Sequence, residues 1–300
     1  MIDQAENLRL MVKNNLNKEK KNIIKSNKAK IITVASGKGG VGKSNVVVNL
    51  AVQLQKAGKR VVVIDADFGF ANVDLICGVT AKYNFIDLIH KDMSIIDILT
   101  TGPLGVKFIS GASEVKDILN YSDDQISKFI ENFTKLEDIA DIILIDTGAG
   151  ISESAISFIE ASHDLIIVTT PEPTSITDAY VLLKTIKNRN IYNQDSIKVG
   201  LIVNQVDSLD DGNQIFGKLK NVANKFLEMD VTNLGYIPYD KNLRNAVRLQ
   251  VPLSIAFPKS KATLAFEQLI KNFLIDEDSN QVDQSKRGIY FFIKKLVSKN

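Results

Sequence analysis

The sequence predicts an α/β fold with a doubly wound, mostly parallel sheet. Apolar, β-branched runs alternate with longer segments of helical periodicity through most of the chain. These runs are apolar throughout, as expected of a sheet that helices cover on both faces. A glycine-rich stretch, SGKGGVGKS at residues 36–44, lies between the first apolar run and the first helical segment. A strand, a glycine-rich turn and a helix in this order are typical of such folds.

The elements follow from these patterns in chain order. Seven buried strands are expected at 30–36, 60–67, 106–110, 141–146, 164–170, 198–204 and 234–238. Seven helices are expected at 44–57, 122–138, 152–161, 175–188, 213–228, 240–249 and 261–274. We therefore expect one domain over residues 30–275. A helix with a basic leash (1–29) precedes it, and an acidic linker (276–285) and an amphipathic helix (286–300) follow.

The amino-acid composition limits which classes of protein and which kinds of metal or disulfide site are possible. With 300 residues and 45% hydrophobic content, the chain can form one large core. The only cysteine, Cys77, excludes a disulfide framework and any metal centre built from several cysteines of one chain. His90 and His163 are far apart in sequence, so we interpret both as ordinary surface or packing residues. Without a signal peptide pattern or an apolar run of membrane-spanning length, the protein is expected to be cytoplasmic.

The glycine-rich stretch predicts a phosphate-binding loop, or P-loop. Its glycines let the backbone curl so that N–H groups face phosphate oxygens, and the next helix adds its positive end. Lys43 would bind the β- and γ-phosphates, and the Ser44 hydroxyl would ligate Mg²⁺. The residues expected to line the nucleotide here are Gly37, Lys38, Gly39, Gly40, Val41, Gly42, Lys43, Ser44 and Asn45.

Lys38 is a second lysine inside this loop, and with it the sequence resembles the deviant Walker A ATPases of the MinD/ParA group. The resemblance covers about residues 30–275. VVVIDADFGFANVDLICG (61–78) and IILIDTGAGI (142–151) also carry it. It implies ATP and Mg²⁺ as cofactors and a homodimer in which Lys38 reaches the partner's nucleotide. Hydrolysis would be slow and would switch the dimer back to monomer.

Further roles follow from the resemblance alone. Asp67 would orient the attacking water near Mg²⁺, and Asp146 would hold a Mg²⁺-bound water. Gly148 and Gly150 would form a loop that senses the γ-phosphate. Lys38, Lys43 and Asp67 form the expected catalytic set, and Asp65 is interpreted as structural. The other residues expected near the phosphates or the base are Asn72, Asn204, Pro238 and Asp240.

Glu172 in TTPEP has two interpretations. It could face the partner's nucleotide, or the turn could exist because of Pro173.

The segment GIYFFIKKLVSK (288–299) predicts an in-plane membrane helix. Its apolar side contains Ile289, Phe292, Ile293 and Leu296, and the opposite side contains Lys294 and Lys295. It resembles the membrane-targeting tail of MinD, so anionic lipid is an expected partner, bound reversibly at the inner face of the cytoplasmic membrane. The alternative is a C-terminal helix that docks on its own domain.

The first residues contain DQAENLR, followed by a leash from Lys13 to Lys30 with seven lysines and one glutamate. The motif resembles the activator motif of the FlhG (FleN/YlxH) family, MinD-like ATPases that govern flagellar number and placement. In that family this helix stimulates the GTPase FlhF, and Gln4 would complete the partner's site. The residues that match the motif are Asp3, Gln4, Ala5, Leu8 and Arg9. Flagellar basal-body components are further candidate partners.

Two other functions are compatible with parts of the sequence. A MinD-type division-site ATPase would share everything except residues 1–29. A ParA-like DNA-associated ATPase would share the nucleotide site but bind DNA in place of lipid. The terminal segments favour the FlhG family, for which no specific nucleic acid is expected.

Overall fold

The computed structural model describes residues 29–67, 72–84, 87–88, 91, 93–111, 132–192 and 197–279. Within these ranges one sheet has eight strands in the order β3-β4-β2-β5-β1-β6-β7-β8. Neighbouring strands are parallel except for the antiparallel pair β3 and β4. Strands that neighbour each other without being consecutive require crossover connections. The predicted doubly wound, mostly parallel α/β fold is therefore confirmed.

The elements have the following bounds. The strands are β1 Lys30–Ala35, β2 Val61–Ala66, β3 Thr100–Thr101, β4 Lys107–Ile109, β5 Ile142–Thr147, β6 Asp164–Thr169, β7 Lys198–Val206 and β8 Thr232–Pro238. The helices are α2 Lys43–Lys56, α3 Asn72–Cys77, α5 Ile95–Ile98, α7 Leu136–Ile139, α8 Glu153–Ala161, α9 Pro173–Asn188, α10 Leu209–Val222, α11 Lys241–Leu249, α12 Leu253–Ala256 and α13 Lys261–Ser279. A 3-10 turn lies at Pro103–Gly105, and a π-helical turn at Ala223–Leu227 follows α10.

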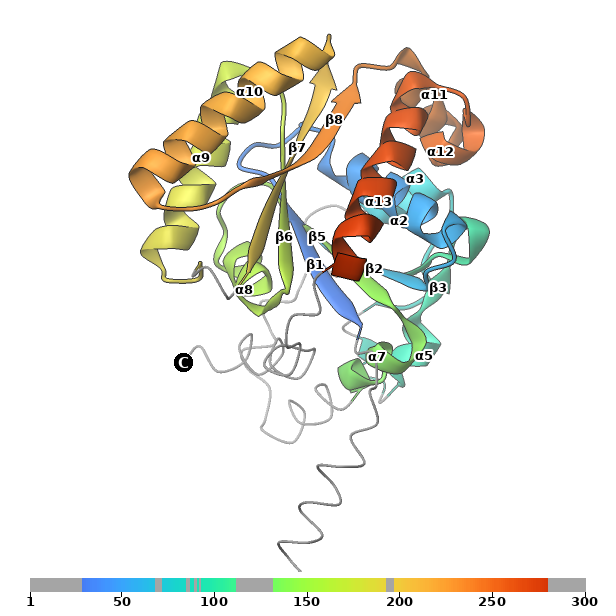
Figure 1. Ribbon diagram of the computed structural model, residues 1–300. Coiled ribbons are helices and arrows are strands. Elements are labelled where there is room, and N and C mark those ends of the chain that lie inside the picture. Colours follow the sequence, from blue (N-terminus) through green and yellow to red (C-terminus); the bar gives the residue numbers. More distant parts are fainter. Residues whose placement is uncertain are drawn as a thin grey trace, which may run out of the picture.

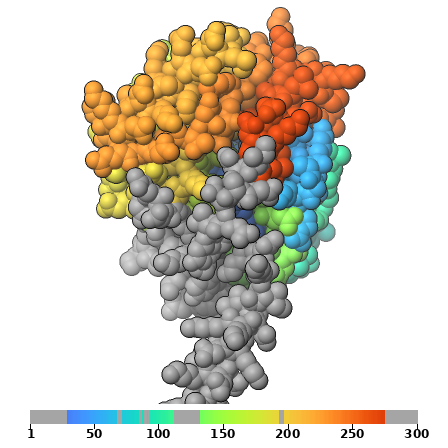
Figure 2. Space-filling model, viewed as in Figure 1, coloured from blue at the N-terminus to red at the C-terminus, as the bar shows by residue number. Residues whose placement is uncertain are grey.

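Helices cover both faces of the sheet, as Figure 1 shows, with α2 and α13 on one face and α9 and α10 on the other. Side chains of β6 alternate between the two resulting cores. Ile166 and Val168 pack with the helices α2 and α13, whereas Leu165 and Ile167 pack with α9 and α10. In Figure 2 the red surface of α13 lies beside the blue surface of α2. This double burial explains why the strands are apolar throughout.

The carboxyl ends of the central strands bring several polar residues together. Val34 of β1 is in register with Asp146 of β5, which in turn is in register with Asp65 of β2. The chain continues from β1 into the glycine-rich loop and from β2 to Asp67. In parallel α/β sheets, ligands bind at this edge.

At the amino ends of the strands, the start of β1 contacts α13. The ammonium nitrogen of Lys30 lies 2.7 Å from Asp164 Oδ2 and 4.5 Å from the centre of the Phe273 ring in α13. The backbone N–H of Ile31 donates to His163 Nδ1 at 3.0 Å, so His163 has a packing role, as its interpretation predicted.

Some element predictions differ from the structure. The short elements α3, α5, α12 and β3 were not predicted. α10 begins at Leu209, four residues before the expected start, because the Ser208 side chain accepts the Asp211 N–H and caps the helix. α13 continues to Ser279, beyond the expected end at Leu274.

The helix expected at 122–138 falls mostly outside the described ranges, and α7 lies in its described part. None of the helices in the described part of the chain is long and apolar enough to cross a bilayer.

Candidate nucleotide-binding site

The glycine-rich loop connects β1 to α2 and leaves the first turn of that helix open. Gly42 precedes α2 with φ 87°, and Gly40 has φ 81°; both lie in the left-handed region that glycine adopts without strain. No side chain caps the start of α2. Its first N–H groups are therefore available to an anion, which the positive end of the helix also favours. The loop fits a phosphate group.

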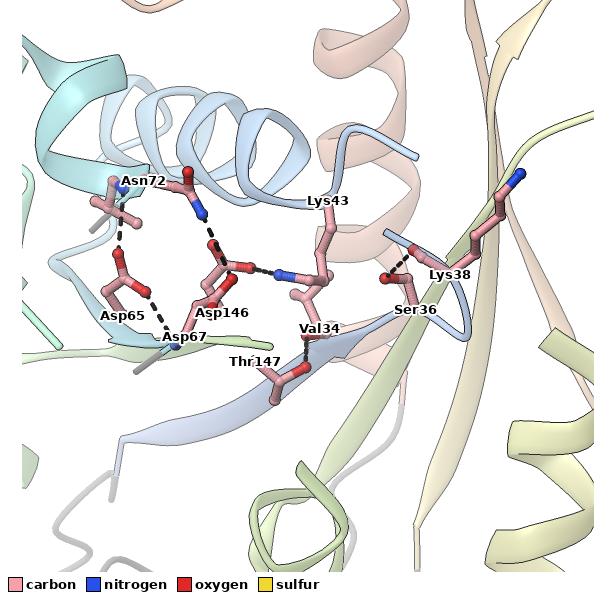
Figure 3. A network of polar contacts seen from close by, with 10 residues as sticks. Val34, Ser36, Lys38, Lys43, Asp65, Asp67, Asn72, Asp146 and Thr147 are labelled. Atoms are coloured by element: carbon pink, nitrogen blue, oxygen red, sulfur yellow. Dashed lines mark hydrogen bonds and ion pairs between the residues drawn. The ribbon is translucent and has the colours of Figure 1, made fainter. Parts of the chain in front are cut away.

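Lys43 and Asp146 form a buried ion pair in the centre of the site (Figure 3). Asp146 is fully buried near the end of β5, and Lys43 is 6% exposed at the start of α2. Burial raises the pKa of Asp146 and outweighs the opposing effects of Lys43 and Ser44. Among the described residues, Asp146 Oδ2 has no hydrogen-bond partner. A buried carboxylate oxygen without a partner, beside the Ser44 side chain, fits a Mg²⁺ ion or its bound water.

Asp67 follows β2 on the other side of this ion pair. The Asn72 side-chain amide donates to Asp67 Oδ2 at 3.4 Å, and a Cβ placed on Gly148 would lie 3.6 Å from Asp67 Oδ1. The loop after β5 therefore passes close to the Asp67 carboxylate. Gly150, with φ 85°, donates its N–H to the Ser36 carbonyl at 3.0 Å. The structure brings Asp67, Asn72, Asp146 and this loop together.

Asp65 is buried beneath this group. It accepts hydrogen bonds from the backbone N–H groups of Asp67 at 3.1 Å and Val73 at 3.2 Å. The pKa of Asp65 is raised to about 7. Burial is the largest cause and the nearby negative charge of Asp146 the second, while the two backbone hydrogen bonds and Lys43 act to lower it.

Lys38 points away from the Lys43–Asp146 pair, as Figure 3 shows. Its ammonium nitrogen lies 2.5 Å from Glu172 Oε2 and 2.9 Å from Thr174 Oγ1, at the start of α9 of the same chain. Glu172 precedes α9 and Pro173 is its first residue, a position where proline is favourable. Both interpretations of this turn therefore remain, and the structure adds a contact within one chain that the sequence did not predict.

Asn204 supports the phosphate-binding loop from β7. Its side-chain nitrogen donates to the Val41 carbonyl at 2.7 Å, and its oxygen accepts the Gln205 N–H at 3.0 Å. A Cβ on Gly42 would come within 2.5 Å of Asn204 Nδ2, so only glycine fits there. Asn204 is thus adjacent to the loop, where an adenine contact was expected.

Pro238 and Asp240 follow β8 near the same edge. Asp240 accepts the N–H groups of Asn242 at 2.9 Å and Ala262 at 3.2 Å and so caps α11. Although burial acts to raise the pKa of Asp240, these hydrogen bonds lower it. Its carboxylate is thus engaged within the fold, and contact of Pro238 and Asp240 with the base stays a prediction.

Several contacts of the site have no clear sequence signal. Thr174 binds Lys38, and the Thr147 hydroxyl donates to the Val34 carbonyl at 3.0 Å. A Cβ on Gly37 would lie 2.4 Å from the backbone of Asp178, so the loop and α9 touch directly. Only Gly37 could have indicated this, because a glycine in a loop often marks a close approach of two backbones.

The activator residues 3–9, the membrane residues 289–296 and His90 lie outside the described ranges.

Known proteins resemble the whole described body. The family described as "ParA: NUBPL iron-transfer P-loop NTPase" matches residues 27–274. The chain belongs to the MinD/ParA family of P-loop ATPases. The "Antiactivator FleN" of Pseudomonas aeruginosa is 39% identical over 89% of this chain and 93% of that protein. The "Flagellum site-determining protein YlxH" of Helicobacter pylori is 33% identical over 89% of this chain and 90% of that protein.

Among solved structures, the septum site-determining protein MinD of Pyrococcus horikoshii, complexed with Mg-ADP, has a TM-score of 0.65 at 26% identity. The match covers 85% of this chain and 99% of that one. The predicted resemblance to the FlhG (FleN/YlxH) group is confirmed by the two flagellar relatives. As a MinD/ParA-family ATPase, the protein hydrolyses ATP to ADP and phosphate. The iron transfer named in that family description is not inferred for this chain, since Cys77 is its only cysteine and is buried.

Proposed function

We propose that the protein is an ATP-dependent, dimerising switch that regulates flagellar number and placement at the membrane. The position of Lys38 is the observation that supports the proposed switch. It is a second lysine in a loop that already has Lys43 beside Asp146, and it extends away from that pair. A cation that its own phosphate site does not need can reach a second copy's nucleotide once it leaves Glu172. The flagellar assignment rests on the similarity to FleN and YlxH.

The residues would have the following roles in binding and hydrolysing Mg-ATP. The open start of α2 and Lys43 bind the phosphates, and Ser44 and Asp146 hold the Mg²⁺ ion and its water. The ion neutralises charge on the phosphates. Asp67 orients the attacking water, and the loop with Gly148 and Gly150 responds to the γ-phosphate. Asn204 and the turn at 238–240 contact the adenine base, and Glu172 remains a candidate for contact with the partner's nucleotide. Hydrolysis is slow until a partner completes the site.

The terminal segments would connect this switch to its partners. Residues 286–300 form a reversible anchor on anionic lipid, and a dimer with two anchors binds more tightly than a monomer. Residues 1–12 stimulate the GTPase FlhF through Gln4. Basal-body components are further candidate partners, and no specific nucleic acid is proposed.

The test of this function uses a peptide of residues 1–20 added to active FlhF from the same organism. We expect faster GTP hydrolysis, and no stimulation from a peptide with Gln4→Ala. An unchanged rate with the unaltered peptide would contradict the proposed activator role. The remaining resemblance would then be equally compatible with a MinD-type division-site ATPase.

A further inference from the structure

We propose that Asp65 is a positioning residue for Asp67. Its carboxylate binds the backbone of Asp67, directly after β2, and of Val73, in the first turn of α3, and thereby sets the place of the Asp67 carboxylate. This inference rests on the proposed role of Asp67 in orienting the attacking water, and it gives Asp65 a part in hydrolysis beyond a structural one.

One side chain joins the end of β2 to the start of α3. Asp65 Oδ1 accepts the N–H of Asp67, directly after β2, at 3.1 Å. Asp65 Oδ2 accepts the N–H of Val73, in the first turn of α3, at 3.2 Å. Figure 3 shows the Asp65 carboxylate beside Asp67 and Asn72. The placement of Asp67, and of Asn72 next to Val73, therefore depends on this carboxylate.

Asp65 is itself held rigidly. It lies in β2, paired in register with Asp146 of β5, and is fully buried. A Cβ on Gly111 would lie 2.6 Å from the Asp65 carbonyl, so the chain also packs tightly against its backbone. A side chain fixed in this way can transmit its position to the groups that bind it.

The aspartate side chain has an acceptor oxygen for each of these two N–H groups. An asparagine in the same place would accept one N–H and direct its own N–H₂ group at the other. The second backbone N–H would then lose its partner, and one of the two segments would be released from residue 65. The variant Asp65→Asn is therefore nearly unchanged in size but breaks one of the two connections.

The test compares Asp65→Asn with Asp67→Ala in the full-length protein. We expect the ATP turnover number of Asp65→Asn to fall by about tenfold or more, as for loss of a transition-state interaction, with half-saturation by ATP changed less than about twofold. The ATP-bound dimer should accumulate, as in Asp67→Ala. The double variant should be no slower than Asp67→Ala, because the two changes act on one step.

Asp74→Asn is the matched control. Asp74 lies in α3, and its Oδ2 accepts the N–H of Ala81, beyond the end of that helix, at 3.3 Å. Its carboxylate binds a backbone N–H as that of Asp65 does, at a different place in the chain. Its turnover number should stay within about twofold of the unaltered protein.

Hydrogen exchange in the unaltered protein provides a second test that does not depend on a variant that folds. The amides of Asp67 and Val73 should exchange slowly. Exchange at the rate of an open loop would overturn the proposal. Unchanged turnover in Asp65→Asn would also overturn it, as would a loss of ATP affinity and turnover together. If Asp67→Ala hydrolysed ATP normally, the proposed role of Asp67 would fail instead, and the exchange rates alone would decide whether Asp65 holds the backbone of Asp67 and Val73.

Discussion

Gly37 and Gly39 of the phosphate-binding loop have different surroundings. A Cβ on Gly37 would lie 2.4 Å from the backbone of Asp178 in α9, whereas a Cβ on Gly39 would make an ordinary 3.6 Å contact with Ala149. We expect Gly37→Ala to lower the free energy of unfolding by about 1–3 kcal/mol, because neither backbone can yield easily. Gly39→Ala should change it by less than half as much. Urea unfolding of both variants without nucleotide checks this, and equal losses would contradict it.

The buried carboxyl of Asp65 predicts a pH dependence of stability. Burial raises its pKa to about 7 in the fold, above its ordinary value of 3.8. The fold thus favours the protonated form, and this stabilisation is present below about pH 4 and is lost as the pH rises to about 7. We expect the free energy of unfolding, measured without nucleotide and Mg²⁺, to fall by up to about 4 kcal/mol over this range from this group.

The measurement is urea unfolding from pH 4 to pH 8 in the presence of a chelator, with Asp65→Asn for comparison. The variant should lack this part of the pH dependence. A parallel pH profile for the two proteins would rule out Asp65 as its source.

The roles of single residues can be predicted where they depend on residues that lie close together in the sequence. The loop from Gly37 to Ser44 could be interpreted from its spacing, because strand, turn and helix follow one another directly. Contacts between distant segments could not. Lys38 was noticed as an extra cation, but its contacts with Glu172 and Thr174 depend on where α9 docks, 134 and 136 residues later.

At the scale of elements, α9 connects two parts of the site. Its first residues hold Lys38, and its C-terminal end is joined to the first residue of α8 by Arg189, which donates to both oxygens of Glu153 at 2.8 and 2.5 Å. α8 follows the loop that contains Gly148 and Gly150. One helix thus contacts the lysine that would reach a second copy, and its C-terminal end is joined to the helix that follows the loop expected to respond to the γ-phosphate.

We therefore expect Glu172→Gln to promote the ATP-dependent dimer. Lys38 must leave Glu172 before it can reach a partner's nucleotide, and the neutral side chain holds the ammonium group less strongly. Size-exclusion chromatography at limiting ATP should show a larger dimer fraction than in the unaltered protein. Glu153→Gln, which removes a similar exposed ion pair at the other end of α9, is the control and should leave the dimer fraction unchanged. A smaller dimer fraction in Glu172→Gln would instead indicate that Glu172 acts on the partner's nucleotide.

Long elements were predicted better than short ones for a physical reason. A helix such as α9 has several turns over which buried positions repeat, so its pattern stands out. α3 and α5 have six and four residues and are set by tertiary hydrogen bonds and local caps. The Ser94 side chain and the Asp97 side chain cap α5 reciprocally. Such a signal spans only four residues and has no periodicity to distinguish it in the sequence.

At the scale of the whole molecule, the membrane proposal makes a simple prediction. Deleting residues 286–300 should abolish ATP-dependent co-sedimentation with vesicles that contain anionic lipid, because the apolar face and the lysines of that segment supply the attraction. ATP turnover should be retained, since the nucleotide site lies in the described body. Charge reversal of Lys294 and Lys295 should weaken binding to anionic vesicles more than to neutral ones. Unchanged co-sedimentation after the deletion would refute the anchor.

The contact of Lys30 with Phe273 places the two chain exits together. Residues 1–28 join the fold beside Lys30, at the amino ends of the strands, and α13 passes the same point on its way to the C-terminal segment. The phosphate-binding loop lies at the other ends of the strands. The body therefore has two poles. We expect the nucleotide and a second subunit to occupy one pole, opposite the pole at which residue 29 leads into β1.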